Sequence, residues 1–218
     1  MKLLIAVKSC QADQNRGLHD TIRATWGKDA KALGIDVRFF VGASFTTHQS
    51  DEIHLKCDDD YNSLPFKTRE ICRWANGKTF SHVFLCDTDT AVSPRKLLAS
   101  GFEKFDYAGK IDRTLGVTFR YESVSRDGLR ETLTRCYPWA SGGYGYSLSR
   151  QAFTTVTQEY PTTWAEDLWV GQVLGPMIAA GDMTALNMPR GSCSEHYLNG
   201  ADPNKLTGWI KETSERIK

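Results

Sequence analysis

The stretch FLCDTDTAV, residues 84–92, begins as an apolar run and ends in two aspartates separated by one residue. Together with His82 and Val83, the run is short and rich in strand-forming residues, so it predicts a buried strand that ends near Asp87. Two carboxylates at a strand end are too polar to be buried without a cation, hydrogen-bond donors or solvent. The first question about this chain is therefore what Asp87 and Asp89 hold.

The segments before this strand alternate between strand and helix patterns. We predict strands over residues 2–7 and 35–42, a helix over 16–27 between them, and a further helix over 67–74. This alternation is typical of an α/β fold with a Rossmann-like, mostly parallel central sheet flanked by helices. Such sheets bind ligands beyond the carboxyl ends of their strands, which is where the two aspartates are expected.

The alternation of strand and helix patterns becomes less regular between Pro94 and about residue 135. This indicates loops that leave the sheet and return to it rather than a second domain. Beyond it, helical spacing covers residues 147–160 and 166–181, the latter interrupted at Gly175-Pro176. Residues 203–218 read as a terminal amphipathic helix that covers the sheet. We therefore expect one domain, 1–218.

The amino-acid composition argues against several functional classes of protein. A net charge of +1, with 24% charged residues, gives no electrostatic footprint for nucleic acid or membrane surfaces. The N-terminal apolar run is too short for a signal peptide core or a membrane span. The six cysteines lack zinc-type spacing, which favours reduced thiols inside a cell, although an even count leaves disulfides open.

Three interpretations of the two aspartates compete. The pair could hold a divalent metal for a nucleotide sugar, it could be the D-x-D-x-T motif of a haloacid-dehalogenase-like phosphatase, or it could be a solvated turn that caps the next helix. Such a phosphatase carries its motif on the first strand, whereas at least two predicted strands precede it here. The second acid of that family's G-D-x-x-x-D motif would also fall on Leu186, which cannot bind metal.

Four further stretches resemble motifs of the inverting family 31 glycosyltransferases, which include β-1,3-galactosyl-, β-1,3-N-acetylglucosaminyl- and Fringe-like enzymes. TIRATWG is similar to the family's I-R-x-T-W-G, and EDLWVG to its E-D-V-x-V-G. DDYNSLPFKTREICRW and YPWASGGYGYSLS resemble two longer motifs. With the D-x-D pair, these stretches follow the family order and extend over residues 21–171.

This resemblance implies a GT-A fold, with a nucleotide-sugar-binding part over about 1–100 and an acceptor-binding, catalytic part over about 101–218. It implies a metal-dependent, inverting transfer of a sugar from a UDP-sugar donor to a hydroxyl of a glycan or glycoconjugate, and a β-1,3 linkage is the family expectation. Nucleic acid is not expected as a partner. Because the family's Golgi members carry an anchor, we expect either a cytoplasmic microbial or viral enzyme or a trimmed Golgi-lumen domain.

The resemblance also implies a metal site. Asp89, the last aspartate of the motif, would bind Mn²⁺ or Mg²⁺ directly, and Asp87 would face the ribose, the donor sugar or a metal-bound water. His196 would be a further protein ligand, because Mn²⁺ tolerates one imidazole among oxygens, with Glu195 as the fallback. A surface or supporting role for His196 is the alternative.

Asp167 would be the general base that takes the proton of the acceptor hydroxyl. Its neighbour Glu166 reads as a helix-start residue, which is also the alternative for Asp167. Gly142 and Gly143 would let the backbone approach the donor sugar, since they lack a Cβ atom.

Arg23 would either bind the diphosphate or anchor the first helix, and Lys67 would either approach the donor or pair with the acidic residues 58–60. Trp139, Trp164 and Trp169 are candidates for stacking on a sugar, with at least one expected in the core. A protein that binds glycans or sugar nucleotides without catalysis is the alternative from another class.

Overall fold

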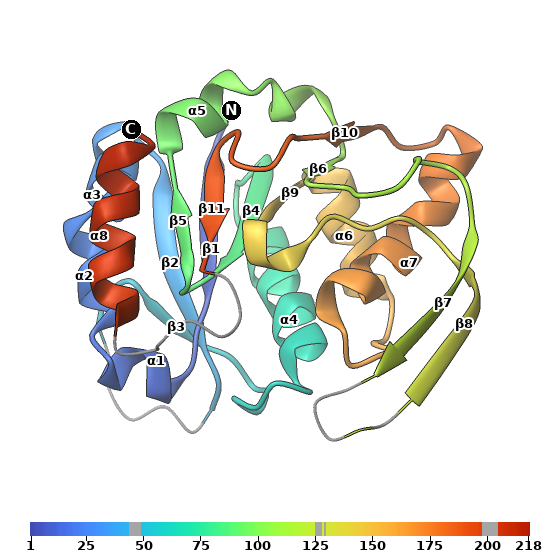
Figure 1. The fold of residues 1–218 in the computed structure, drawn as a ribbon, viewed down its shortest axis with the longest axis horizontal. Helices are drawn as coiled ribbons and strands as arrows, with labels where there is room; N and C mark the ends of the chain where they lie inside the picture. Colours follow the sequence, from blue (N-terminus) through green and yellow to red (C-terminus); the bar gives the residue numbers. More distant parts are fainter. Residues whose placement is uncertain (44–48, 125–127, 129, 198–204) are drawn as a thin grey trace.

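The computed structural model describes residues 1–43, 49–124, 128, 130–197 and 205–218. Its centre is a seven-stranded sheet in the order β10-β6-β9-β4-β1-β2-β3 (Figure 1). These strands are β1 (Leu3–Lys8), β2 (Asp36–Val41), β3 (Glu52–His54), β4 (His82–Asp87), β6 (Tyr107–Gly109), β9 (Tyr146–Ser149) and β10 (Ala185–Asn187). All neighbours pair in parallel except where β9 runs antiparallel between β4 and β6. The predicted α/β fold with a mostly parallel sheet is confirmed.

Two antiparallel strand pairs stand beside the large sheet. β5 (Thr90–Val92) follows the two aspartates and pairs with β11 (Ser194–His196). β7 (Phe119–Val124) and β8 (Arg130–Cys136) form a hairpin that projects past α7 (Figure 1). The first pair brings the C-terminal part of the chain to the D-x-D segment.

Helices cover both faces of the sheet, with α2, α3 and α8 on one side and α4, α6 and α7 on the other (Figure 1). The helices are α1 (Gln11–Asn15), α2 (Leu18–Ala24), α3 (Trp26–Ala32), α4 (Leu64–Asn76), α5 (Pro94–Ala99), α6 (Arg150–Gln158), α7 (Glu166–Ala180) and α8 (Leu206–Arg216), with short 3₁₀ turns η1 (Phe102–Lys104) and η2 (Gly142–Tyr144). Alternate side chains of β1 enter the two resulting cores, since neighbouring residues of a strand point to opposite faces.

The helix predicted over 16–27 is divided at Thr25 into α2 and α3. The Thr25 hydroxyl donates to the carbonyl of Thr21 at 2.7 Å, and the chain bends there. A Cβ atom on Gly27 would lie 2.6 Å from the carbonyl oxygen of Ile22, so glycine permits the tight bend. Trp26 is 1% exposed and belongs to the core.

Three helix predictions need correction. The segment predicted as a helix from residue 147 begins as strand β9, and the helix α6 starts only at Arg150, where the Ser149 side chain caps it. α7 runs through Gly175-Pro176 without interruption. The terminal helix α8 begins only at Leu206, where it packs on α2 and β5 on one face of the sheet, and residues 203–204 lie outside the described part. No helix in the described part of the chain is long and apolar enough to cross a membrane.

Candidate active site

The carboxyl ends of β1 and β4 bring Lys8 and Asp87 together. The two residues are direct partners in the parallel register, and Lys8 Nζ lies 3.3 Å from Asp87 Oδ1. The same Nζ lies 2.9 Å from Oε2 of Glu166, the first residue of α7. Only 2% of the Lys8 side chain is exposed, so this ammonium is a buried cation held between two carboxylates.

Glu166 has both carboxylate oxygens occupied. Besides Lys8, it accepts hydrogen bonds from the hydroxyl of Thr68 on α4 at 2.6 Å and from the hydroxyl of Tyr146 on β9. Four elements therefore meet at one buried carboxylate. We call Lys8, Thr68, Asp87, Tyr146 and Glu166 the strand-end cluster. Glu166 anchors the start of α7 and leaves the next residue, Asp167, to face the cavity.

Ionisation in the cluster follows from burial and charge. Burial raises the pKa of the Asp87 carboxyl to about 6, aided by Asp89 and Glu166, although Lys8 opposes the rise. Burial alone would lower the pKa of Lys8, but attraction by Asp87 and Glu166 outweighs it and raises that pKa. Lys8 is therefore charged at neutral pH.

The pairing of β5 with β11 brings His196 to Asp89. His196 Nε2 lies 3.3 Å from Asp89 Oδ2, and the Tyr197 amide donates to the Asp89 carbonyl at 3.0 Å. The hydrogen bond to Asp89 raises the pKa of His196. The other carboxylate oxygen, Asp89 Oδ1, is buried without a hydrogen-bond partner among the described residues. A buried carboxylate oxygen without a partner is a vacant acceptor for a donor or a cation.

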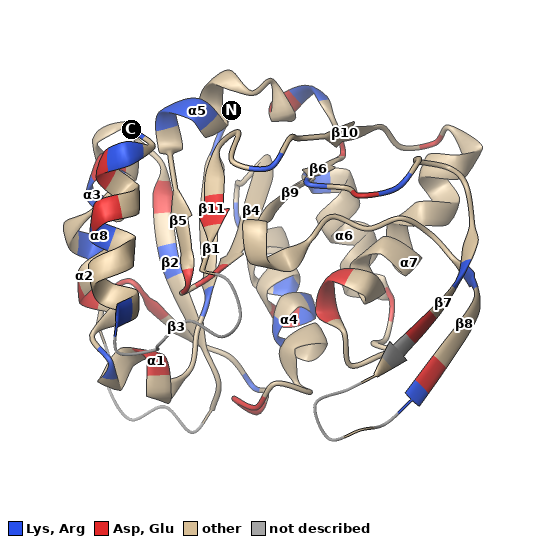
Figure 2. Cartoon of the chain, viewed as in Figure 1, with Lys and Arg blue, Asp and Glu red and all other residues tan. Residues whose placement is uncertain are grey.

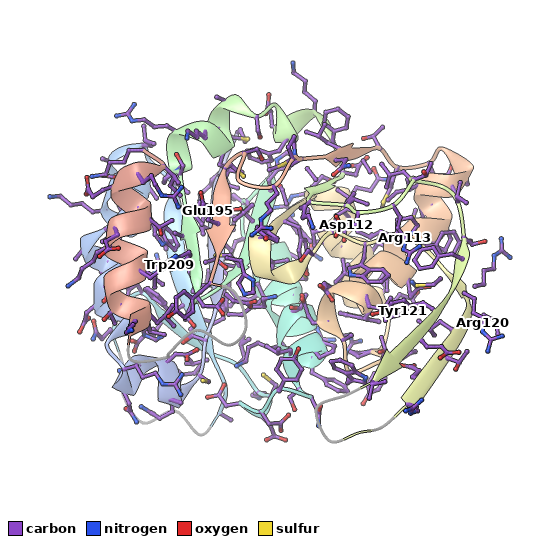
Figure 3. All side chains as sticks on the ribbon, viewed as in Figure 1. Asp112, Arg113, Arg120, Tyr121, Glu195 and Trp209 are labelled. Atoms are coloured by element: carbon purple, nitrogen blue, oxygen red, sulfur yellow. The ribbon has the colours of Figure 1, made fainter. Side chains whose placement is uncertain are left out.

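A carboxylate and an imidazole at this position fit a divalent ion such as Mn²⁺, because that ion accepts both ligand types. The structure does not supply a complete protein cage, since no group of three or more His, Cys, Asp or Glu side chains is placed to hold a metal in the described part. Asp87 is paired with Lys8, and its predicted place beside the ribose, the donor sugar or a metal-bound water stays a prediction. Glu195, the predicted fallback, points instead to Arg216, with contacts of 2.9 and 2.6 Å (Figure 3).

The two glycines of η2 are required for close packing. A Cβ atom on Gly143 would lie 2.7 Å from the His196 ring, so only glycine lets the imidazole occupy its position. Gly143 also fixes the D-x-D turn, because its carbonyl accepts the Thr90 hydroxyl at 2.9 Å. A Cβ on Gly142 would lie 3.3 Å from a Glu166 oxygen, which is tight but less severe.

Asp167 lines a cavity of about 390 Å³ together with Asp87, Asp89 and His196. Figure 2 shows acidic positions at the turn between β4 and β5 and at the start of α7. Asp167 Oδ2 accepts the Gly142 amide at 2.9 Å and Oδ1 accepts the Leu168 amide at 2.8 Å, which fixes its orientation. Burial and the nearby Glu166 raise the pKa of Asp167, against these amides. A raised pKa suits a carboxylate that accepts a proton.

Aromatic side chains also line this cavity. Tyr61 contacts Trp164 at 5.9 Å between ring centroids, and Tyr121 of β7 contacts Trp139 at 4.9 Å. We call these four residues the aromatic wall. Trp169, the third predicted stacking residue, is 1% exposed and belongs to the core. The expectation that at least one of the three tryptophans serves packing is confirmed.

A second cavity of about 330 Å³ adjoins the first and shares Lys8, Asp87 and Asp89 with it. Lys67 reaches this cavity while its Nζ pairs with Asp59 at 2.5 Å, so its two predicted roles are compatible.

Arg23 does not reach either cavity. Its guanidinium nitrogens bind Asp20, Asp51 and Glu52, so the prediction of diphosphate binding is corrected in favour of the anchoring role.

The sequence matches the model of the galactosyltransferase family over residues 19–180, which is most of the chain and includes every site residue described above except Lys8 and His196. The chain belongs to the galactosyltransferase family. The predicted glycosyltransferase activity class is thus confirmed, and this is a family of UDP-sugar-dependent hexosyltransferases. The fold has the mostly parallel α/β sheet flanked by helices that was predicted.

Solved structures resemble this galactosyltransferase-family chain only distantly. The galactosyltransferase LgtC, solved with donor and acceptor sugar analogues, has a TM-score of 0.49 at 12% identity and covers 100% of this chain and 95% of its own. The 4-diphosphocytidyl-2C-methyl-D-erythritol synthase from Anaerococcus prevotii has a TM-score of 0.49 at 5% identity, and the match covers 99% of this chain and 96% of that protein. The inositol-1-phosphate CTP transferase from T. maritima has a TM-score of 0.47 at 13% sequence identity, and the match covers 97% of each chain. Among curated proteins, none matches the sequence.

Sequence reasoning missed Lys8 and Tyr121. A lysine directly after the apolar run of residues 3–7 was a usable signal, because a charge at a buried strand end needs a partner. Tyr121 carried no signal of its own, since only the fold of the hairpin brings it to Trp139.

Proposed function

We propose that this chain is a metal-dependent, inverting transferase that moves a hexose from a UDP-sugar to a hydroxyl of a glycan or glycoconjugate, with a β-1,3 linkage as the family expectation. The observation that carries the proposal is the placement of Asp167 in one cavity with the Asp89–His196 pair. One carboxylate with a raised pKa, opposite a site for a charged leaving group, is the arrangement that a single-step inverting displacement requires.

Different residues of the chain have separate roles in the proposed transfer. Asp167 accepts the proton of the acceptor hydroxyl as that oxygen attacks the anomeric carbon. Gly142 and Leu168 hold the carboxylate through their amides while this happens. The aromatic wall presents apolar faces to the sugars and excludes water from the reaction. A divalent ion held by Asp89 and His196 would neutralise negative charge on the departing UDP.

Two alternatives predict different behaviour. In a haloacid-dehalogenase-like phosphatase Asp87 would attack phosphorus from the first strand of the chain, but here Asp87 is paired with buried Lys8, and β1, β2 and β3 precede β4. A binder without catalysis has no need for a fixed carboxylate such as Asp167. Family membership counts against both.

The first test is calorimetric titration of UDP into the protein with Mn²⁺ and again with EDTA. The proposal expects binding that requires Mn²⁺ and is lost in Asp89→Ala, and expects UDP release from UDP-galactose or another UDP-hexose by the wild type. A matched control is Asp182→Ala, which removes an exposed carboxylate after α7. Binding that is equally strong in EDTA, or no binding under either condition, contradicts the proposal.

The six cysteines are all unpaired, which supports the further proposal that the enzyme works in a reducing compartment such as the cytoplasm. Counting free thiols in protein isolated under alkylating conditions from its native cells checks this. Six alkylated cysteines are expected, and a disulfide-linked pair would contradict the placement.

A further inference from the structure

A third cavity lies directly beside the first. It has a volume of about 250 Å³ and is lined by Asp112, Arg113, Trp139 and Ser141. Trp139 lines both cavities, and Ser141 directly precedes Gly142 of the first. Complete ligand pockets usually have about 300–1,000 Å³. A smaller hollow that shares a wall with a larger pocket fits one ring of a larger ligand better than a separate ligand.

The wall shared by the two cavities is held in place from behind. A Cβ atom on Gly171 of α7 would lie 2.5 Å from the Trp139 Cβ, and one on Gly175 would lie 2.2 Å from the Tyr137 Cβ. Glycine at both positions lets the segment with Trp139 pack directly against the helix. The Trp139 ring is further supported by Phe119 at 6.0 Å and Tyr121 at 4.9 Å between centroids. The shared wall is therefore a fixed, partly exposed aromatic surface.

The charged groups of the third cavity are placed to bind hydroxyls. The Arg113 guanidinium stacks on Phe119 at 3.9 Å and makes no hydrogen bond or ion pair with any described residue, so its donors are available. Asp112 is 68% exposed in its side chain and pairs with Lys110 at 2.7 Å, which leaves lone pairs on its carboxylate. Figure 3 labels Asp112, Arg113 and Tyr121 on the side of the molecule that carries the β7–β8 hairpin.

We infer that the third cavity is a second acceptor subsite, which binds the penultimate sugar of a neutral glycan while the terminal sugar lies in the first cavity near Asp167. This inference rests on the proposed function of the first cavity. A hexose has an apolar face of C–H groups for Trp139 and a rim of hydroxyls that can donate to Asp112 and accept from Arg113. Asp112 is already paired with Lys110 and Arg113 can donate to hydroxyls, so the cavity requires no acidic group on the sugar. The preferred acceptor is therefore at least a disaccharide.

The test compares matched acceptors. Protein saturated with UDP and Mn²⁺ is titrated with methyl β-galactoside against methyl β-lactoside, with the N-acetylglucosaminide against the chitobioside, and with the glucoside against the cellobioside. In at least one pair the disaccharide is expected to bind at least about tenfold more tightly, from a few added hydrogen bonds and ring contacts. Arg113→Ala and Asp112→Asn should each reduce this difference in affinity between the disaccharide and the monosaccharide. The matched control Arg120→Ala, at the outer edge of the same hairpin, should keep it (Figure 3).

The two proposals fail separately. If UDP does not bind with Mn²⁺, the proposed function has failed. If UDP binds as expected but no disaccharide binds better than its matched monosaccharide, only the second subsite is contradicted. A gap that survives in the Arg113→Ala, Asp112→Asn double variant, or a preference confined to sulfated or uronic-acid disaccharides, also overturns the inference.

Discussion

The strand-end cluster and the aromatic wall face the same cavity but are built on different principles. The cluster is a buried ionic network, with Lys8 and Glu166 side chains at 2% and 5% exposure. The wall consists of partly exposed rings, with Tyr61 at 41%. A cluster of this kind fixes distances, because each contact depends on two partners and the cost of losing one is high. A wall of rings offers broad contact and tolerates change. We expect the cluster to govern stability and chemistry, and the wall to govern acceptor choice.

The largest effect on stability is expected from Lys8→Met, which leaves Asp87 and Glu166 buried without their cation. Breaking a buried pair in this way costs about 3–5 kcal/mol of unfolding free energy. Denaturation in urea measures it, with the exposed Lys96→Met as the control, for which a change within about 0.5 kcal/mol is expected. If both variants unfold at the same urea concentration as the wild type, the cluster does not hold the fold together.

The two glycines of η2 provide a matched pair of variants for testing the proposed metal site. Gly143→Ala forces the His196 ring away, so it should lower Mn²⁺-dependent UDP affinity by at least about tenfold, which corresponds to about 1.4 kcal/mol. Gly142→Ala meets its nearest atom at 3.3 Å and should change that affinity less. Calorimetry with and without EDTA makes the comparison. Equal losses in the two variants would mean that the His196 position is not what Gly143 protects.

On the acidic side of the pH profile, the transfer rate should follow the protonation of Asp167. Its raised pKa means that the carboxylate becomes protonated, and the base is lost, at a higher pH than an ordinary aspartate with a pKa near 3.8. The rate is therefore present above this raised pKa and declines as the pH falls through it. The profile is measured at saturating donor, with UDP affinity followed at each pH to separate binding from chemistry. A rate that stays constant down to pH 4 contradicts the assignment.

The smallest effect on the fold is expected from the aromatic wall. Tyr121→Leu should change the free energy of unfolding by less than about 1 kcal/mol, because the ring is only partly buried. It should instead raise the KM for the acceptor while leaving the KM for the donor unchanged. Val124→Thr, at an exposed position of the same strand, is the control. A large loss of stability in Tyr121→Leu would erase the distinction between wall and cluster.

The fold was predictable where neighbouring residues carry the signal. The apolar run ending at Asp87 predicted β4, and the regular alternation before it predicted β1 and β2. The start of α6 was misplaced because the SLS segment pairs with β4 and β6, a contact that no local pattern encodes. The β7–β8 hairpin was not predicted as a unit, since most positions of β8 are exposed and polar, and the contacts of β7 with Trp139 depend on the fold.

The site was predictable only in part, for a similar reason. The motifs indicated Asp89 and Asp167, the family resemblance indicated His196, and the structure brings these residues to one cavity. The partner of Lys8 is 158 residues away, so its role depends on the fold. The Trp139 surface likewise requires Gly171 and Gly175 of α7, whose purpose cannot be seen from the sequence around them.

The most direct test of the account is the transfer rate of Asp167→Asn, measured beside its affinity for UDP in Mn²⁺. Asparagine keeps the size of the side chain and can accept one of the two backbone amides, from Gly142 or Leu168, through its remaining oxygen, but it cannot take a proton. We expect kcat to fall by about 10²–10⁴-fold, the usual contribution of a general base, with UDP affinity unchanged. The exposed Asp182→Asn should behave as the wild type. A variant Asp167→Asn that transfers sugar at the wild-type rate would contradict the central claim.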